Sequence, residues 1–62
     1  MDAAARARAQ AEIATLKDYL SSTDYMVIKC LERGLDMASE YPSEYAGRQS
    51  ARERINELEA TL

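Results

Sequence analysis

Residues 3 to 20 contain no glycine, proline, serine or asparagine. They are mostly alanine, arginine, glutamine, glutamate, leucine and lysine, which have high helix propensity. Within this stretch four apolar residues recur at intervals of four, three and four, as they do along a coiled-coil seam: Ala9, Ile13, Leu16 and Leu20. The stretch therefore predicts a helix over residues 3–20 with one narrow apolar face.

A polar segment follows and predicts a turn into a second helix. Ser21 and Asp24 have the spacing of a capping box, and Thr23 is an equally good N-cap. We expect a tight turn near residues 21–22 and a helix over residues 23–34. One face of this helix carries four apolar residues: Val27, Ile28, Leu31 and Leu35.

The end of this second helix has two interpretations. Gly34 can end the helix in the left-handed conformation, or the helix can continue to about Ser39. A continuous helix would place four acidic side chains at four-residue intervals on one face: Glu32, Asp36, Glu40 and Glu44. Like charges at this spacing repel each other and destabilise a helix. This pattern favours a break near Gly34 and an irregular stretch up to Tyr41.

A third helix is predicted over residues 42–61. Pro42 suits the first turn of a helix, whereas Gly47 weakens the early turns by about 1 kcal/mol relative to alanine. The apolar spacing of four, three and four then returns at Ala51, Ile55, Leu58 and Leu62. The sequence thus predicts an all-α fold, with three short helices in a single domain over residues 1–62.

The size of the chain predicts self-association. A chain of 62 residues buries only about 60% of the surface that its unfolded form exposes. Cys30 is the one cysteine and histidine is absent, which excludes an intrachain disulfide and a zinc site. We therefore expect a coiled-coil-like homo-oligomer, with these residues at its interface: Ile13, Leu16, Leu20, Ile55 and Leu58.

Composition also bears on partners and location. The net charge of −3 argues against binding of duplex DNA, which needs a basic surface. No segment approaches the ~20 apolar residues of a membrane span, and the N-terminus lacks the apolar run of a signal peptide. With a single free thiol, these features favour a cytoplasmic protein that has no membrane partner.

Catalytic and metal sites are not predicted. Cys30 lies among apolar neighbours, without a residue that would activate its thiol, and no nucleophile, base and oxyanion donor can be assembled. The acidic series from Glu32 to Glu44 lacks the alternating ligands and central glycine of a calcium-binding loop. We expect a protein without enzymatic activity, metal or cofactor.

A basic group occupies the seam of the third helix. Arg48 lies seven residues before Ile55, where an apolar residue is expected, and Arg52 and Tyr45 lie about one turn to either side. One interpretation is that the stem of Arg48 crosses the core boundary and its guanidinium stays in water. The other is a clamp for an anion or a nucleotide, because guanidinium groups bind phosphate through two parallel hydrogen bonds.

Two residues of the second helix are candidates for the same site. Tyr25 and Lys29 lie four apart near a helix N-terminus, where a ring and a point charge can assist anion binding. Lys29 can equally form an ordinary surface pair with Glu32. The predicted ligand site is Tyr25, Lys29, Tyr45, Arg48 and Arg52.

Two blocks of the sequence stand out as motifs. One reads Thr-Asp-Tyr-x-Val-Ile-Lys at residues 23–29, and the other reads Arg-Gln-x-x-Arg-x-x-Ile-Asn-x-Leu-Glu at residues 48–59. Both resemble blocks of short bacteriophage and prophage proteins that have no settled activity, and the first block is the more specific. The likeness spans about residues 12–60 and implies a phage origin, often near tail genes. In that group a large aromatic residue often precedes the second arginine, whereas this chain has Ala51, which lacks a ring for stacking.

Two functions fit these features. The first is an anti-defence protein that sequesters a nucleotide or other phosphorylated signal of the host, with Tyr25, Arg48 and Arg52 among its binding residues. The second is a structural or assembly accessory, for example of a phage tail, whose helices pack on a protein partner. The tyrosines and arginines beside the seams favour the first function.

Overall fold

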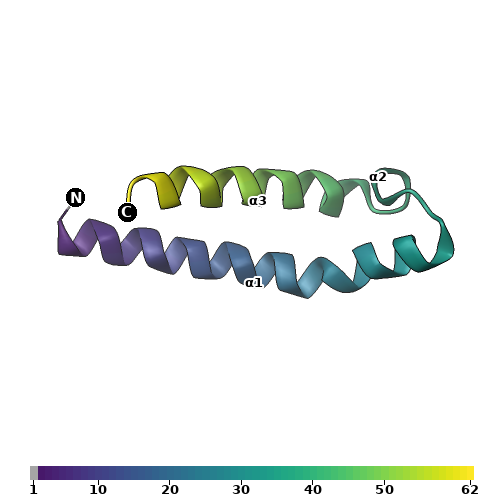
Figure 1. Ribbon diagram of the computed structural model, residues 1–62, viewed down its shortest axis with the longest axis horizontal. Helices are drawn as coiled ribbons and strands as arrows, with labels where there is room; N and C mark the ends of the chain where they lie inside the picture. Colours follow the sequence, from purple (N-terminus) through teal and green to yellow (C-terminus); the bar gives the residue numbers. More distant parts are fainter. Residues whose placement is uncertain (1) are drawn as a thin grey trace.

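The protein is a helical hairpin. The computed structural model describes residues 2–62, and all regular structure in this range is helical. Two long helices, α1 (Ala3–Arg33) and α3 (Pro42–Ala60), run antiparallel, and the short α2 (Met37–Glu40) lies at their connection (Figure 1). Both ends of the chain therefore lie at the same end of a rod of 46 × 15 × 15 Å. The prediction of an all-α fold with three helices is confirmed, although its division into helices is not.

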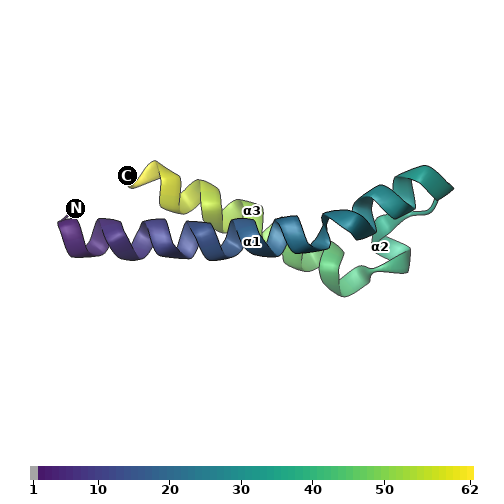
Figure 2. The ribbon, with the colours of Figure 1, turned by 90° about the horizontal axis from the view of Figure 1, so that it is seen from below.

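α1 is one continuous helix of 31 residues, so the predicted turn at residues 21–22 is wrong. Thr23, one of the predicted N-caps, instead donates a hydrogen bond back to the Tyr19 carbonyl at 2.9 Å, and so does the neighbouring Ser22, also at 2.9 Å. Such bonds satisfy the hydroxyl groups inside a helix and often bend it. α1 does change direction beyond its midpoint (Figure 2). The polar segment therefore accompanies a bend and not a break.

The apolar seam of α1 continues through the polar segment. After Leu20 it continues at intervals of three, four and three residues to Thr23, Val27 and Cys30. Thr23 and Cys30 are buried and Val27 is half-buried, so this line faces α3 and, at Cys30, α2. The four apolar residues that were expected on one face of residues 27–35 therefore differ in their burial. Ile28, Leu31 and Leu35 are 52%, 80% and 40% exposed.

Gly34 ends α1, as predicted. It has a left-handed φ of 66°, and the Leu35 N–H donates to the Cys30 carbonyl at 2.8 Å, which satisfies a carbonyl at the helix end. The alternative of a helix that continues to Ser39 is wrong. The following stretch is less irregular than expected, because it contains α2.

α3 begins at Pro42 and ends at Ala60, within one residue of the predicted end. The hydrophobic core between α1 and α3 consists of Ala9, Ile13, Ile55 and Leu58, with Leu16 and Leu20 packed against it. The five residues predicted at an interface between protomers thus pack between two helices of the same chain. Leu62, the last residue of the predicted seam, lies beyond α3 and is 44% exposed.

Candidate functional site

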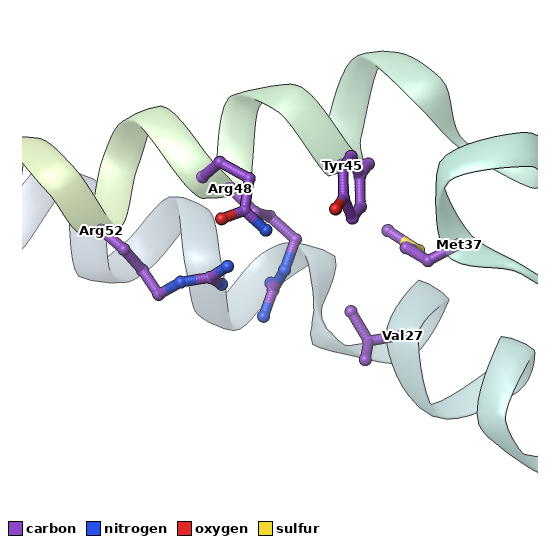
Figure 3. Close-up of a pocket in the computed structure, with 6 residues that line it drawn as sticks. Val27, Met37, Tyr45, Arg48 and Arg52 are labelled. Carbon is purple, nitrogen blue, oxygen red and sulfur yellow. The ribbon is translucent and has the colours of Figure 1, made fainter.

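A hollow of about 190 Å³ lies toward the connected end of the hairpin, where all three helices contribute side chains. α1 supplies Val27, α2 supplies Met37, and the other lining residues come from α3: Tyr45, Arg48, Gln49 and Arg52 (Figure 3). Three of the five predicted ligand residues, Tyr45, Arg48 and Arg52, are therefore brought together. Drug-sized ligands occupy larger pockets, of about 300–1,000 Å³.

Arg48 is held by α1. Its Nη1 donates to the Leu20 carbonyl at 2.7 Å and to Thr23 Oγ1 at 2.6 Å, and its Nη2 lies 2.9 Å from Asp24 Oδ1. Only 14% of its side chain is exposed. Two of its nitrogens therefore connect α3 to α1, and its charge is paired with a carboxylate.

Gly47, next to Arg48, lets the two helices approach closely at this level. A Cβ atom built on Gly47 would collide with the Tyr19 hydroxyl and lie 3.1 Å from the ring carbon that bears it. A glycine that weakens an isolated helix thus leaves space here for the Tyr19 side chain, which would have to shift if residue 47 carried a methyl group. This close approach lies beside the Arg48 contacts and helps to keep α1 within reach of the guanidinium.

Arg52 has a different environment. It is exposed, and within residues 2–62 its guanidinium makes no hydrogen bond or salt bridge. The guanidinium extends along the hollow toward that of Arg48 (Figure 3). Asp24 is the carboxylate paired with Arg48, so the charge of Arg52 is left uncompensated at this end of the hollow.

The other end of the hollow is apolar. The side chains of Val27, Met37 and Tyr45 lie together there, away from Arg52 (Figure 3). Tyr45 is 43% exposed and offers both its ring and its hydroxyl. The hollow therefore has a cationic end and an apolar end.

The remaining two predicted ligand residues lie outside the hollow. Tyr25 is 71% exposed, and Lys29 Nζ donates to the Tyr41 hydroxyl at 3.2 Å. The hydrogen bond to Tyr41 raises the pKa of Lys29. Lys29 Nζ also lies 5.8 Å from the centre of the Tyr41 ring, within range of a cation–π interaction. Lys29 thus ties α1 to the residue that joins α2 and α3.

Sequence reasoning missed three residues that line the hollow: Val27, Met37 and Gln49. Gln49 is adjacent to Arg48, and a wider search around that arginine would have included it. Met37 carries no local signal, because it reaches the hollow only through α2, which was not predicted.

A second surface of interest lies on α1. Tyr25, Ile28 and Leu31 follow one another at three-residue intervals, so they share one side of the helix. We call them the α1 stripe; they are 71%, 52% and 80% exposed. Neighbouring large apolar residues on a helix surface often mark a contact with another molecule.

The described part of the chain offers little for a metal site, an accessible cysteine or a membrane-spanning helix. Within residues 2–62 no three His, Cys, Asp or Glu residues are grouped to hold a metal ion. Cys30 is buried, with its Sγ 4.0 Å from Met37 Sδ. None of the helices in this range is both long and apolar enough to cross a membrane.

The chain matches no protein-family model, and neither a curated protein nor a solved structure matches it. The hollow and the α1 stripe are therefore the two features that bear on function, and they differ in chemical character. The stripe suits an apolar protein surface, whereas the hollow suits a small anion.

Proposed function

We propose that this protein is a non-enzymatic assembly protein that self-associates through the α1 stripe and serves as an accessory to a larger structure, such as a phage tail. The observation that supports this function best is the exposure of Tyr25, Ile28 and Leu31 on one side of α1. The resemblance to phage proteins supports the phage context and a location in the host cytoplasm.

The thin core supports a role in association. The buried apolar residues are Ala9, Ile13, Cys30, Ala51, Ile55 and Leu58, and half of these side chains are small. Chains below about 70–80 residues seldom obtain enough stability from such a core alone. Burial of a leucine side chain stabilises a protein by about 1.5–3 kcal/mol. Covering Leu31 and its neighbours in an interface therefore adds a stabilisation that the single chain lacks.

The occupant proposed for the stripe is a second copy of the chain. The contact is symmetric, because each copy brings the same three residues, and two-fold contacts are the commonest in homo-oligomers. The stripe extends over six residue steps, or about 9 Å along the helix axis. So short a contact suits two helices that cross at an angle, with interlocking side chains.

Sedimentation equilibrium tests the association at micromolar concentration. We expect the wild-type chain to sediment as a dimer or larger and Leu31→Glu to shift it toward 6.9 kDa. Leu62→Glu is a matched control, because Leu62 is an exposed leucine outside the stripe. A wild-type mass of 6.9 kDa with full helicity would overturn the proposal.

Sequestration of a phosphorylated host signal is the second candidate function, and the hollow with Tyr45, Arg48 and Arg52 favours it. Because the hollow has a volume of only about 190 Å³, a nucleotide would extend beyond it or bridge the hollows of two copies. Calorimetric titration with cyclic dinucleotides tests this function. Absence of binding heat and of any rise in melting temperature would contradict it.

A further inference from the structure

The two arginines of the hollow differ in the donors that they offer to a ligand. Arg48 has two nitrogens engaged by Leu20, Thr23 and Asp24. Within residues 2–62 the Arg52 guanidinium makes no hydrogen bond or salt bridge, and it extends into the same space. A ligand can therefore engage Arg52 without breaking a contact, whereas engaging Arg48 would compete with contacts that join α1 to α3.

The donors around the cationic end favour a phosphate group. A guanidinium fork binds two oxygens at once. The Gln49 amide and the Tyr45 hydroxyl line the same hollow and can each donate one more hydrogen bond. A phosphate monoester presents three terminal oxygens and about two negative charges, whereas a carboxylate presents two oxygens and one charge. Phosphate therefore uses more of these donors.

The apolar end of the hollow limits which substituent a bound phosphate group can carry. Val27, Met37 and the Tyr45 ring form a surface for an aromatic or short aliphatic group. The volume of about 190 Å³ leaves space for a phosphate and a single ring but not for a dinucleotide. We propose that the hollow binds a small phosphate monoester with an apolar or aromatic substituent, and that Arg52 is the residue that holds the phosphate. This inference rests on the second candidate function and narrows its ligand class.

Calorimetric titration of the full chain with phenyl phosphate tests the inference, with inorganic phosphate and benzoate as comparison ligands. We expect phenyl phosphate to bind more tightly than either, because inorganic phosphate leaves the apolar end empty and benzoate offers the cationic end only two oxygens and one charge. Arg52→Gln should weaken its binding about tenfold or more, as expected for the loss of a charged hydrogen bond. Arg33→Gln is the matched control, because it removes an exposed arginine outside the hollow.

Each outcome bears on a different part of the inference. Equal weakening by Arg52→Gln and Arg33→Gln would overturn the site, because it indicates non-specific attraction of anions. Benzoate binding as tight as that of phenyl phosphate would overturn the phosphate class. If a cyclic dinucleotide binds through Arg52 and phenyl phosphate does not, the ligand class is wrong while sequestration survives. If no phosphorylated ligand binds, both fail.

Discussion

Arg48 replaces an apolar residue in the seam of α3, and the structure gives the reason. Opposite it on α1 lies Thr23, which is buried and also belongs to a seam. The two side chains form a polar layer between apolar layers, in which Arg48 also donates to the Leu20 carbonyl and pairs with the Asp24 carboxylate. A polar residue in a helical seam can specify the register of pairing at some cost in stability.

Replacement of Arg48 should therefore affect folding more than replacement of Arg52. We expect Arg48→Ala to lower the free energy of unfolding by about 2–3 kcal/mol, because it removes hydrogen bonds to a charged group. Arg52→Ala, at an exposed position that makes no hydrogen bond or salt bridge within residues 2–62, should change it by less than about 0.5 kcal/mol. Urea unfolding followed by circular dichroism measures both. Equal stability of the two variants would contradict the structural role of Arg48.

Gly47 and Tyr19 provide a second test at the residue scale. In an isolated helix Gly47→Ala would gain about 1 kcal/mol, but here the added methyl group meets the Tyr19 hydroxyl. Overpacking costs about 1–3 kcal/mol, so we expect a net loss of stability. The loss should be smaller in a Tyr19→Phe background, which a double-mutant cycle of melting temperatures would reveal. A stabilising Gly47→Ala in the wild-type background would contradict this expectation and show that the Tyr19 side chain moves aside at little cost.

Glu12 and Arg54 form an ion pair between α1 and α3 that should respond to acid. Arg54 Nε lies 2.7 Å from Glu12 Oε2, and this hydrogen bond lowers the pKa of Glu12 below 4.5. A carboxylate whose pKa is lowered on folding stabilises the protein above its unfolded pKa, and this contribution disappears as the pH falls through the folded pKa. The melting temperature should therefore drop less between pH 6 and pH 3 in Glu12→Gln than in the wild type. An identical drop in both proteins would exclude a contribution from this pair.

At the scale of elements, the hairpin depends on how α1 ends. Gly34 has a φ of 66°, and a Cβ atom there would meet no atom within 4 Å, so only the backbone opposes a larger residue. We expect Gly34→Ala to lower the free energy of unfolding by about 1–2 kcal/mol. Gly34→Asn should be less harmful, because asparagine tolerates the left-handed conformation. Thermal unfolding ranks the three proteins, and equal losses for Ala and Asn would contradict a backbone origin.

For the whole molecule, charge is distributed unevenly along the hairpin. Residues 24–44 contain five acidic and two basic residues, which accounts for the net charge of −3 of the entire chain. Glu32 lies within this segment, next to Leu31 of the α1 stripe. If two copies meet through their stripes, their acidic ends approach and repel each other, an effect that salt screens.

Self-association through the α1 stripe should therefore strengthen in 0.5 M salt compared with about 0.01 M salt, where the Debye length is about 30 Å. Glu32→Gln should strengthen it at low salt, because the substitution removes one like-charge contribution from each copy. Sedimentation velocity across a concentration series measures both effects. Weaker self-association of Glu32→Gln would instead point to a basic counterpart for Glu32 across the interface.

The helical conformation of residues 3–20, 23–33 and 42–60, the break at Gly34 and the two apolar seams could be predicted from the sequence, because each depends on propensity and spacing within a few turns. The predicted site was correct in part. Tyr45 and Arg52 flank Arg48 on the same helix, so their meeting in the hollow follows from helical spacing.

The tertiary structure alone decided the rest. Local capping signals at Ser21–Thr23 fit either a new helix or a bend, and the pairing of Thr23 with Arg48, 25 residues away, favours the continuous helix. Tyr25 and Lys29 fit the local pattern of a ligand site, but α1 presents Tyr25 to the outside and Tyr41 engages Lys29. Local patterns report what a segment can form, whereas the partner of each side chain depends on which distant segment packs against it.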